Sequence, residues 1–266
     1  MHTLLSNIDN RGILTLNMNR PQAHNAFDAD MIRELIEALS AADQDDTIRM
    51  VVITGTGACF SAGADINWMR SLKDASLDEN QRDAMQLAKL LRRLNYLSKP
   101  SIARINGAAY GGGLGLIATC DITIAADHAR FGLTEVRLGL APAVISPYVI
   151  RRIGESNARR YFLSGERFDA GQAKDIGLIQ QYVAASQLDE AVENIIRRLL
   201  KGGPLAIAHC KQLVFTVMGH KQESQKTTDE LTTKLIADLR VSAEGQEGLA
   251  AFLEKRNPDW IDDEVK

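Results

Sequence analysis

Residues 101–121, SIARINGAAYGGGLGLIATCD, form an apolar strand that runs into three consecutive glycines and then into a helix. Glycine loses the most chain entropy on folding, so Gly111, Gly112 and Gly113 make sense where backbone amides approach a ligand closely. A helix that begins there directs unpaired N–H groups and the positive end of its dipole at that point. The stretch predicts either an oxyanion site or a buried turn that lets a helix pack tightly.

A second stretch, residues 51–65, has the same order of parts. It reads VVITGTGACFSAGAD, an apolar strand followed by small residues and a helix start. Two strand ends that each offer a bare amide can hold one oxygen from two sides, which favours the oxyanion site. Neither stretch matches the dinucleotide fingerprint or the phosphate loop, because the glycine spacing differs and no lysine follows.

The composition is that of an ordinary globular protein and excludes several function classes. The chain has 266 residues and a net charge of -3 with interspersed signs, so nucleic-acid binding is disfavoured. The 3 cysteines and 5 histidines are scattered without metal-ligand or disulfide spacing, and we expect no metal site. No apolar run reaches the roughly 18 residues of a membrane span, and no targeting pattern begins the chain. We expect a soluble, cytoplasmic protein with no membrane partner.

Strands alternate with helices in the first half of the chain, which predicts an α/β core. Residues 3–8 and 13–18 alternate around Asp9-Asn10-Arg11-Gly12 and predict an antiparallel hairpin. After residue 142 the pattern is mainly helical, with helices expected over 145–153 and 156–163. Gly202-Gly203-Pro204 is the clearest linker, so we expect an α/β core over 1–202 and a helical region over 203–266 that packs on a neighbouring subunit.

Seven motifs spread over nearly the whole chain add to this interpretation. They are Arg20-Pro21 to Asn25-Ala26, Phe60 to Asp65, Asn106 to Gly113, Cys120-Asp121, Phe131 to Glu135, Leu138 to Pro142 and Phe252 to Arg256. Together they resemble the crotonase, or enoyl-CoA hydratase/isomerase, superfamily. The resemblance implies a spiral of ββα turns with a C-terminal α-helical trimerisation region, assembled as a homotrimer or a dimer of trimers. It also implies acyl-CoA thioesters as substrates, with no cofactor beyond their coenzyme A moiety.

The resemblance also assigns roles to individual residues. The oxyanion hole would be the backbone N–H groups of Ala64 and Gly112, the same two strand ends identified above. These donors would stabilise the enolate formed next to a thioester, and losing one typically costs roughly 10²- to 10³-fold in rate. The matching positions for coenzyme A and substrate binding, with Lys255 on the coenzyme phosphates, are Ala62, Asp65, Ile66, Gly111, Phe252 and Lys255.

Glu135 matches the second of the two glutamates that hydratases of this superfamily use as acid and base. Without the resemblance, the sequence favours a loop carboxylate paired with Arg137 over a catalytic group. In an apolar pocket its pKa would rise toward neutrality, where it can accept and return a proton. The first glutamate of the pair is replaced by Gly115. This departure favours members with one glutamate, either isomerases or a branch of methylglutaconyl-CoA hydratases.

The segment Ser146-Pro147-Tyr148 resembles that hydratase branch. We therefore expect a hydratase acting on a branched, carboxylated enoyl-CoA such as 3-methylglutaconyl-CoA, in leucine or terpenoid-type catabolism. The alternatives are a Δ3,Δ2-enoyl-CoA isomerase that uses Glu135 alone and a catalytically silent acyl-CoA binder. Candidate contacts to the acyl group, including partners for its distal carboxylate, are Trp68, Tyr110, Arg137, Ser146 and Tyr148.

Overall fold

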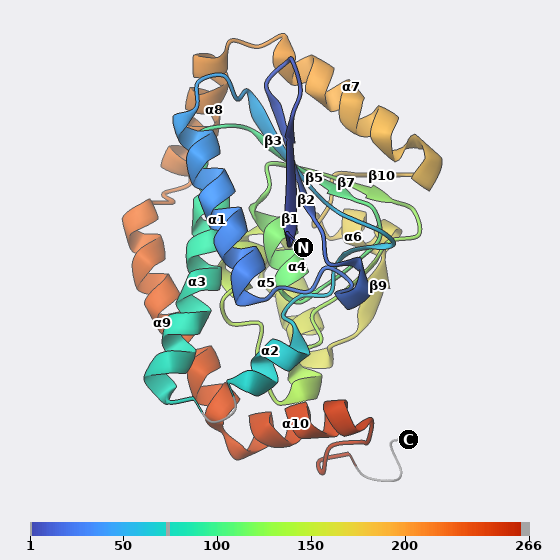
Figure 1. The fold of residues 1–266 in the computed structure, drawn as a ribbon, viewed down its shortest axis with the longest axis vertical. Helices are drawn as coiled ribbons and strands as arrows, with labels where there is room; N and C mark the ends of the chain where they lie inside the picture. The colour runs from blue at the N-terminus through green and yellow to red at the C-terminus, as the bar shows by residue number, and fades with distance from the viewer. Residues whose placement is uncertain (1, 73–74, 262–266) are drawn as a thin grey trace.

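The computed structural model describes residues 2–72 and 75–261, which form two sheets surrounded by helices (Figure 1). The α-helices of this part are α1 (Ala29–Gln44), α2 (Ile66–Ser71), α3 (Leu77–Asn95), α4 (Gly112–Thr119), α5 (Ser146–Ser164), α6 (Ala170–Asp175), α7 (Leu188–Leu200), α8 (Pro204–Val217), α9 (Gln222–Val241) and α10 (Ala243–Glu254). Short 3₁₀ helices are η1 (Pro21–Ala23), η2 (Glu135–Leu138) and η3 (Ala185–Gln187). None of the helices in these ranges is long and apolar enough to cross a membrane.

The larger sheet has the strand order β1-β2-β3-β5-β7-β10. Its strands are β1 (Leu4–Ile8), β2 (Ile13–Met18), β3 (Met50–Gly55), β5 (Ser101–Ile105), β7 (Ile122–Ala126) and β10 (Gln181–Val183). The expected hairpin is confirmed, because β1 and β2 pair antiparallel with Leu4 opposite Met18. Each later pair in the sheet is parallel.

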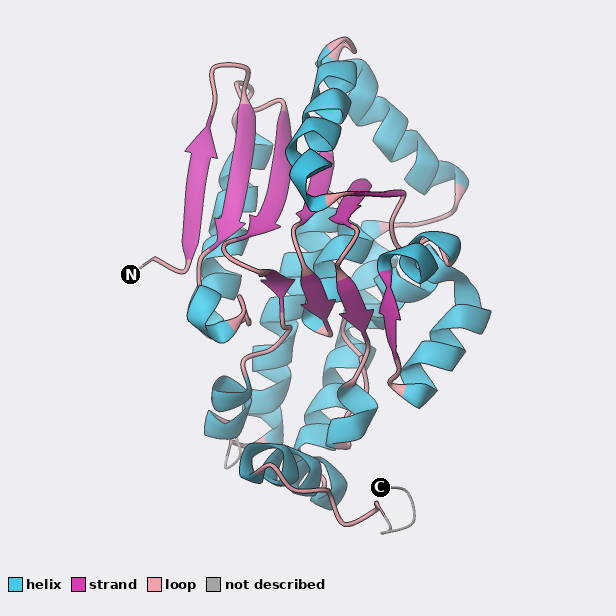
Figure 2. Cartoon of the chain, turned by 90° about the vertical axis from the view of Figure 1, so that its right-hand side faces the viewer, coloured by secondary structure: helices cyan, strands magenta, loops and turns pink. Residues whose placement is uncertain are grey.

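The smaller sheet has the order β4-β6-β8-β9, from β4 (Cys59–Ser61), β6 (Ala108–Tyr110), β8 (Arg130–Gly132) and β9 (Arg167–Asp169). Each of β3, β5 and β7 runs within a few residues into β4, β6 and β8 respectively. The short strands therefore lie beyond the ends of the long ones (Figure 2). A long strand, a short strand and a helix thus repeat along the chain, which is the ββα spiral that the resemblance implied.

The larger sheet is covered on both faces, as parallel sheets require. Alternate strand residues point to opposite faces: Val51 and Ile53 join the main core with α1, α3 and α4, whereas Val52 and Ile102 pack with the α7 side. Figure 1 shows α1 and α3 on one side of the strands and α7 on the other. Because both faces of the larger sheet are apolar, its central strands are buried. The short strands that follow them along the chain are positioned by these buried strands.

Helix α9 packs along α3, so the C-terminal helices share the main core with the rest of the chain. Arg92 of α3 pairs with the buried Asp229 of α9, and Gln225 bonds to the same carboxylate. The division at residue 202 stays a prediction. The two helices expected after residue 142 are confirmed: together they form α5, and the break between them is Gly154, whose backbone geometry is not helical.

Candidate active site

The two glycine-rich strand ends lie side by side because β4 and β6 are neighbouring parallel strands. Gly63 has a φ of 85°, and a methyl group on it would lie 2.8 Å from Tyr110 O and 3.2 Å from Gly112 N. Such distances are too short for a side chain. Glycine at this position therefore permits the two loops to meet.

Ala64 presents an unused backbone amide at this meeting point. Its neighbours are occupied, since Phe27 N donates to Gly63 O at 2.6 Å and Asp65 N donates to Phe27 O at 2.8 Å. The Asp65 carboxylate caps α2 and pairs with Arg20 at 2.8 Å. Among the described residues Ala64 N donates no hydrogen bond. The two hydrogen bonds with Phe27 thus hold the backbone of residues 63–65 in place and leave the N–H group of Ala64 available.

Gly112 supplies the second amide as the first residue of α4. The first N–H groups of a helix have no intrahelical partner, and the helix dipole is positive there. Gly111, before it, has a φ of 48° and donates its own N–H to Gly132 O at 3.0 Å. The two free amides, on Ala64 and Gly112, can therefore donate to one oxygen.

Glu135, the first residue of η2, places its carboxylate against Gly111. A methyl group on Gly111 would lie 3.0 Å from Glu135 Oε1. Glu135 Oε2 is buried and has no hydrogen-bond partner among the described residues. Burial raises the pKa of Glu135 from 4.5 to about 7. A carboxylate with one oxygen buried and unpartnered is unusual and is suited to accepting and returning a proton near neutral pH.

A single cavity of about 1180 Å³ joins these groups. Of the residues that the sequence singled out, its wall contains Ala62, Ala64, Asp65, Ile66, Tyr110, Gly111, Gly112, Glu135, Arg137 and Phe252. The structure therefore brings the proposed amides, the glutamate and most proposed coenzyme positions to one site. No cluster of His, Cys, Asp or Glu suited to a metal occurs in residues 2–72 and 75–261.

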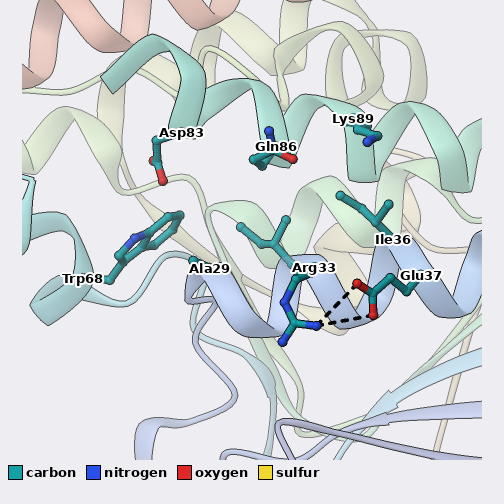
Figure 3. Close-up of a pocket in the computed structure, with 9 residues that line it drawn as sticks. Ala29, Arg33, Ile36, Glu37, Trp68, Asp83, Gln86 and Lys89 are labelled. Carbon is teal, nitrogen blue, oxygen red and sulfur yellow. Dashed lines mark hydrogen bonds and ion pairs between the residues drawn. The ribbon is translucent and has the colours of Figure 1, made fainter. Parts of the chain in front are cut away.

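Four singled-out residues do not belong to the described wall of this cavity. Trp68 lines a separate hollow of about 190 Å³ between α1 and α3 (Figure 3). The Ser146 hydroxyl donates to Ala143 O at 2.7 Å, and the buried Tyr148 lies beside Arg151. These three expected acyl contacts therefore face elsewhere, because α5 turns Ser146 and Tyr148 away. Lys255 is exposed at the end of α10, and its contact with the coenzyme stays a prediction.

Gly115 leaves no room for a second glutamate. A methyl group there would lie 2.6 Å from Ile145 Cγ2 and 3.3 Å from Leu91 Cδ1. Within the described cavity wall only Asp65 and Glu135 carry carboxylates, and Asp65 is committed to its cap and ion pair. Glu135 is therefore the one carboxylate of this wall that is available for proton transfer.

We expect the substitution Gly115→Glu to destabilise the protein rather than to restore a pair of glutamates. Overpacking typically costs about 1–3 kcal/mol, and an unpaired buried charge adds to that. Thermal unfolding should show a Tm lowered by several degrees. The double variant Gly115→Glu/Ile145→Ala should recover part of the loss. An unchanged Tm in the single variant would contradict the close packing of Ile145 on Gly115.

Sequence reasoning missed several residues of the cavity. Arg167 comes from β9 and lies 5.2 Å from the centre of the Tyr110 ring. Ile236 and Arg240 come from α9, more than a hundred residues from the glycine-rich loops. The only signal for that pair was their spacing of four residues, which places them on one face of a helix.

Comparison with known proteins agrees with this geometry. The family model described as enoyl-CoA hydratase/isomerase matches residues 9–263. The chain is 35% identical over 255 residues to a 2,3-dehydroadipyl-CoA hydratase of Escherichia coli, covering 93% of this chain and 94% of that protein. Among solved structures, an enoyl-CoA hydratase of Shewanella pealeana is 41% identical, with a TM-score of 0.79 and coverage of 97% and 96%. An enoyl-CoA hydratase of Mycobacterium avium is 32% identical, with a TM-score of 0.87 and coverage of 98% and 100%.

The chain belongs to the enoyl-CoA hydratase/isomerase family, within the crotonase superfamily. The family and the names of these relatives support an activity of the enoyl-CoA hydratase type, with an acyl-CoA thioester as the substrate.

Proposed function

We propose that this enzyme hydrates a branched enoyl-CoA such as 3-methylglutaconyl-CoA, whose acyl group carries a free carboxylate at the end away from the thioester. The observation that carries the proposal is the buried, unpartnered Oε2 of Glu135 in one cavity with two unused amides. The E. coli relative, by its name, hydrates dehydroadipyl-CoA, whose acyl group also ends in a carboxylate. That supports a carboxylated substrate without fixing its branching.

In the proposed reaction, ionised Glu135 accepts a proton from a water near carbon three of the acyl group. The resulting hydroxide adds to carbon three, and negative charge moves to the thioester oxygen. The N–H groups of Ala64 and Gly112 donate to that oxygen and stabilise the enolate. Glu135, now neutral, returns the proton to carbon two. One carboxylate thus serves as base and then as acid, which requires a pKa near neutrality.

One observation favours a second function, the isomerisation of Δ3 to Δ2 enoyl-CoA. Ile145 and Leu91 crowd the position of the missing second glutamate next to Gly115, and an isomerase needs one group that moves a proton between carbons two and four. Glu135 could serve in that reaction without any water. A catalytically silent binder remains the third alternative.

The three alternatives separate when the purified protein is mixed with crotonyl-CoA, 3-methylglutaconyl-CoA and 3-hexenoyl-CoA. Hydration removes the absorbance of the conjugated thioester, whereas isomerisation of 3-hexenoyl-CoA creates it. We expect loss of absorbance, fastest with 3-methylglutaconyl-CoA. Activity with 3-hexenoyl-CoA alone would favour the isomerase, and no change with any of the three would favour the binder.

We further propose that the chain assembles as a homotrimer or a dimer of trimers through its C-terminal helices. Helix α8 and the residue after it expose a group of large apolar side chains, each at least 60% exposed: Leu205, Leu213, Val214, Val217 and Met218. An apolar patch of this kind on a helix typically marks a protein interface. In such an assembly Lys255 can reach the coenzyme of a neighbouring subunit.

Analytical ultracentrifugation tests the assembly, and the expected mass is three or six times the 29.2 kDa of one chain. Replacing Val214 and Val217 by Asp should shift the protein toward monomers, because charges are costly in a buried interface. Replacing the exposed Arg159 of α5 by Asp serves as the control. A wild-type monomer at micromolar concentration that still binds acyl-CoA tightly would contradict the assembly.

A further inference from the structure

Four arginines from the described residues line the cavity, and Arg240 differs from the others. Arg137, Arg167 and Arg256 are exposed, whereas the Arg240 side chain keeps only 11% of its surface accessible. Arg240 belongs to α9, which also places the buried Ile236 in the cavity wall. A buried arginine beside a ligand cavity requires partners for its charge.

The partners that the structure provides do not use the full capacity of this guanidinium. Its Nη1 donates to Asp83 Oδ2 of α3 at 2.8 Å. Its Nε is buried without a hydrogen-bond partner among the described residues, so the donors that a ligand can reach are on the two Nη nitrogens. A guanidinium has five N–H donors in a planar fork that suits a carboxylate. The side chain therefore has donors to spare at the cavity.

The wall of the same cavity also contains apolar side chains. Helix α3 contributes Ala84 and Leu87 to the wall, and Leu140 and Val144 contribute from the segment after η2. An apolar chain can lie against these side chains, and Arg240 is the cation that its far end can meet. Asp83, the ion-pair partner of this guanidinium, lines the separate hollow seen in Figure 3 and not the cavity.

We propose that Arg240 determines substrate specificity by binding the carboxylate at the far end of the acyl group. This inference rests on the proposed hydration of a carboxylated enoyl-CoA and names the residue that selects it. It replaces Ser146 and Tyr148, which do not reach the cavity, and it competes with the exposed Arg137 for the same role. Burial makes Arg240 the stronger partner, because a charge-assisted hydrogen bond gains strength away from water.

The Arg240–Asp83 pair makes the proposal testable, because substitutions of its two members should change substrate binding in opposite directions. If Arg240 binds the substrate carboxylate, the Asp83 charge repels that carboxylate, and Asp83→Asn should strengthen binding. Burial already raises the pKa of Asp83, so a neutral side chain suits the site. Arg240→Gln should weaken binding. If the pair only docks α9 on α3, both substitutions should act in the same direction, through loss of stability.

The experiment compares two unreactive thioesters by titration calorimetry, glutaryl-CoA with a terminal carboxylate and butyryl-CoA without one. Arg240→Gln should lower the preference for glutaryl-CoA over butyryl-CoA by about ten- to a hundredfold, the usual range for a hydrogen bond to a charged group. Asp83→Asn should raise the same preference several-fold. Lys89→Gln removes a charge from α3 at the separate hollow, outside the described cavity wall, and should leave the preference unchanged. Arg137→Gln tests the competing arginine.

A wild-type protein without preference for glutaryl-CoA, or equal losses in Arg240→Gln and Asp83→Asn, would overturn the role of Arg240. A large loss in Arg137→Gln alone would assign the role to Arg137 instead. These measurements need no turnover, so they stay informative if the protein hydrates none of the enoyl-CoA substrates. In that case the proposed function fails while the carboxylate site is still judged by binding.

Discussion

The variant Glu135→Gln should hydrate its enoyl-CoA substrate about 10³-fold more slowly than the wild type. Glutamine keeps the shape of the side chain but can neither accept nor return the proton, and general acid–base catalysis contributes typically about 10²- to 10⁴-fold. Within the described cavity wall no other uncommitted carboxylate can take over. Steady-state kinetics should show the loss in kcat, with KM little changed, because the proposed coenzyme contacts lie elsewhere.

The pH dependence provides an independent check on Glu135. Catalysis starts from the ionised carboxylate, so kcat/KM of the wild type should rise with pH through about 7, the raised pKa of Glu135. Stability should move the other way. The folded-state pKa lies above the ordinary 4.5, so the stabilising effect of the protonated side chain is full below about pH 4.5 and is lost as the pH passes 7.

Glu135→Gln should remove this trend and be the more stable protein at pH 8. Near-normal turnover of Glu135→Gln on every acyl-CoA tested would show that the base lies elsewhere. A wild-type rate that falls between pH 6 and 8 would contradict an ionised Glu135 as the starting state.

The variant Gly112→Pro should lose at least about two orders of magnitude in kcat. Proline has no N–H, so one of the two proposed oxyanion donors disappears, and the loss of one such donor typically costs about 10²- to 10³-fold. The fold should survive because Gly112 is the first residue of α4, a position that tolerates proline. Stopped-flow or steady-state kinetics with the same enoyl-CoA measures the loss.

Gly112→Ala is the matched control for this substitution. A Cβ atom at residue 112 lies 2.9 Å from Phe27 Cε2 in either variant, but alanine keeps the N–H group. The difference between the two variants therefore isolates the donor from the contact with Phe27. Equal activity of folded Gly112→Pro and Gly112→Ala would remove the Gly112 amide from the mechanism.

The sequence predicted those parts of the fold whose pattern is local. The hairpin of β1 and β2 follows from alternation around a turn, which is a pattern of neighbouring residues. Strands β4, β6 and β9 escaped prediction because each has three residues, too few for a periodic pattern to appear. They form because the long strands that precede them are neighbours in the larger sheet and bring the short segments side by side. That arrangement depends on the tertiary structure.

The residues of the candidate site also divide into those that a local sequence pattern predicts and those that only tertiary packing brings to the cavity. Ala64, Gly112 and Glu135 could be found because glycine-rich strand ends and the motif around Glu135 are visible along the chain. Tyr148 was placed wrongly in the acyl pocket, since its direction depends on how α5 leaves Ile145. Arg240 could not be found, because only the packing of α9 on α3 brings it to the cavity.

The contact between Gly115 and Ile145 has a consequence for how this enzyme can evolve. A change at residue 115 alone meets the Ile145 side chain, and truncation of the buried Ile145 alone leaves a void that typically costs about 2–5 kcal/mol. Most single domains have only about 5–15 kcal/mol of stability in total. Each single-substitution intermediate on the way to a second glutamate is therefore less stable than the present protein. A site with two glutamates is separated from the present one by a coupled pair of substitutions at residues 115 and 145, so directed evolution should sample both codons together.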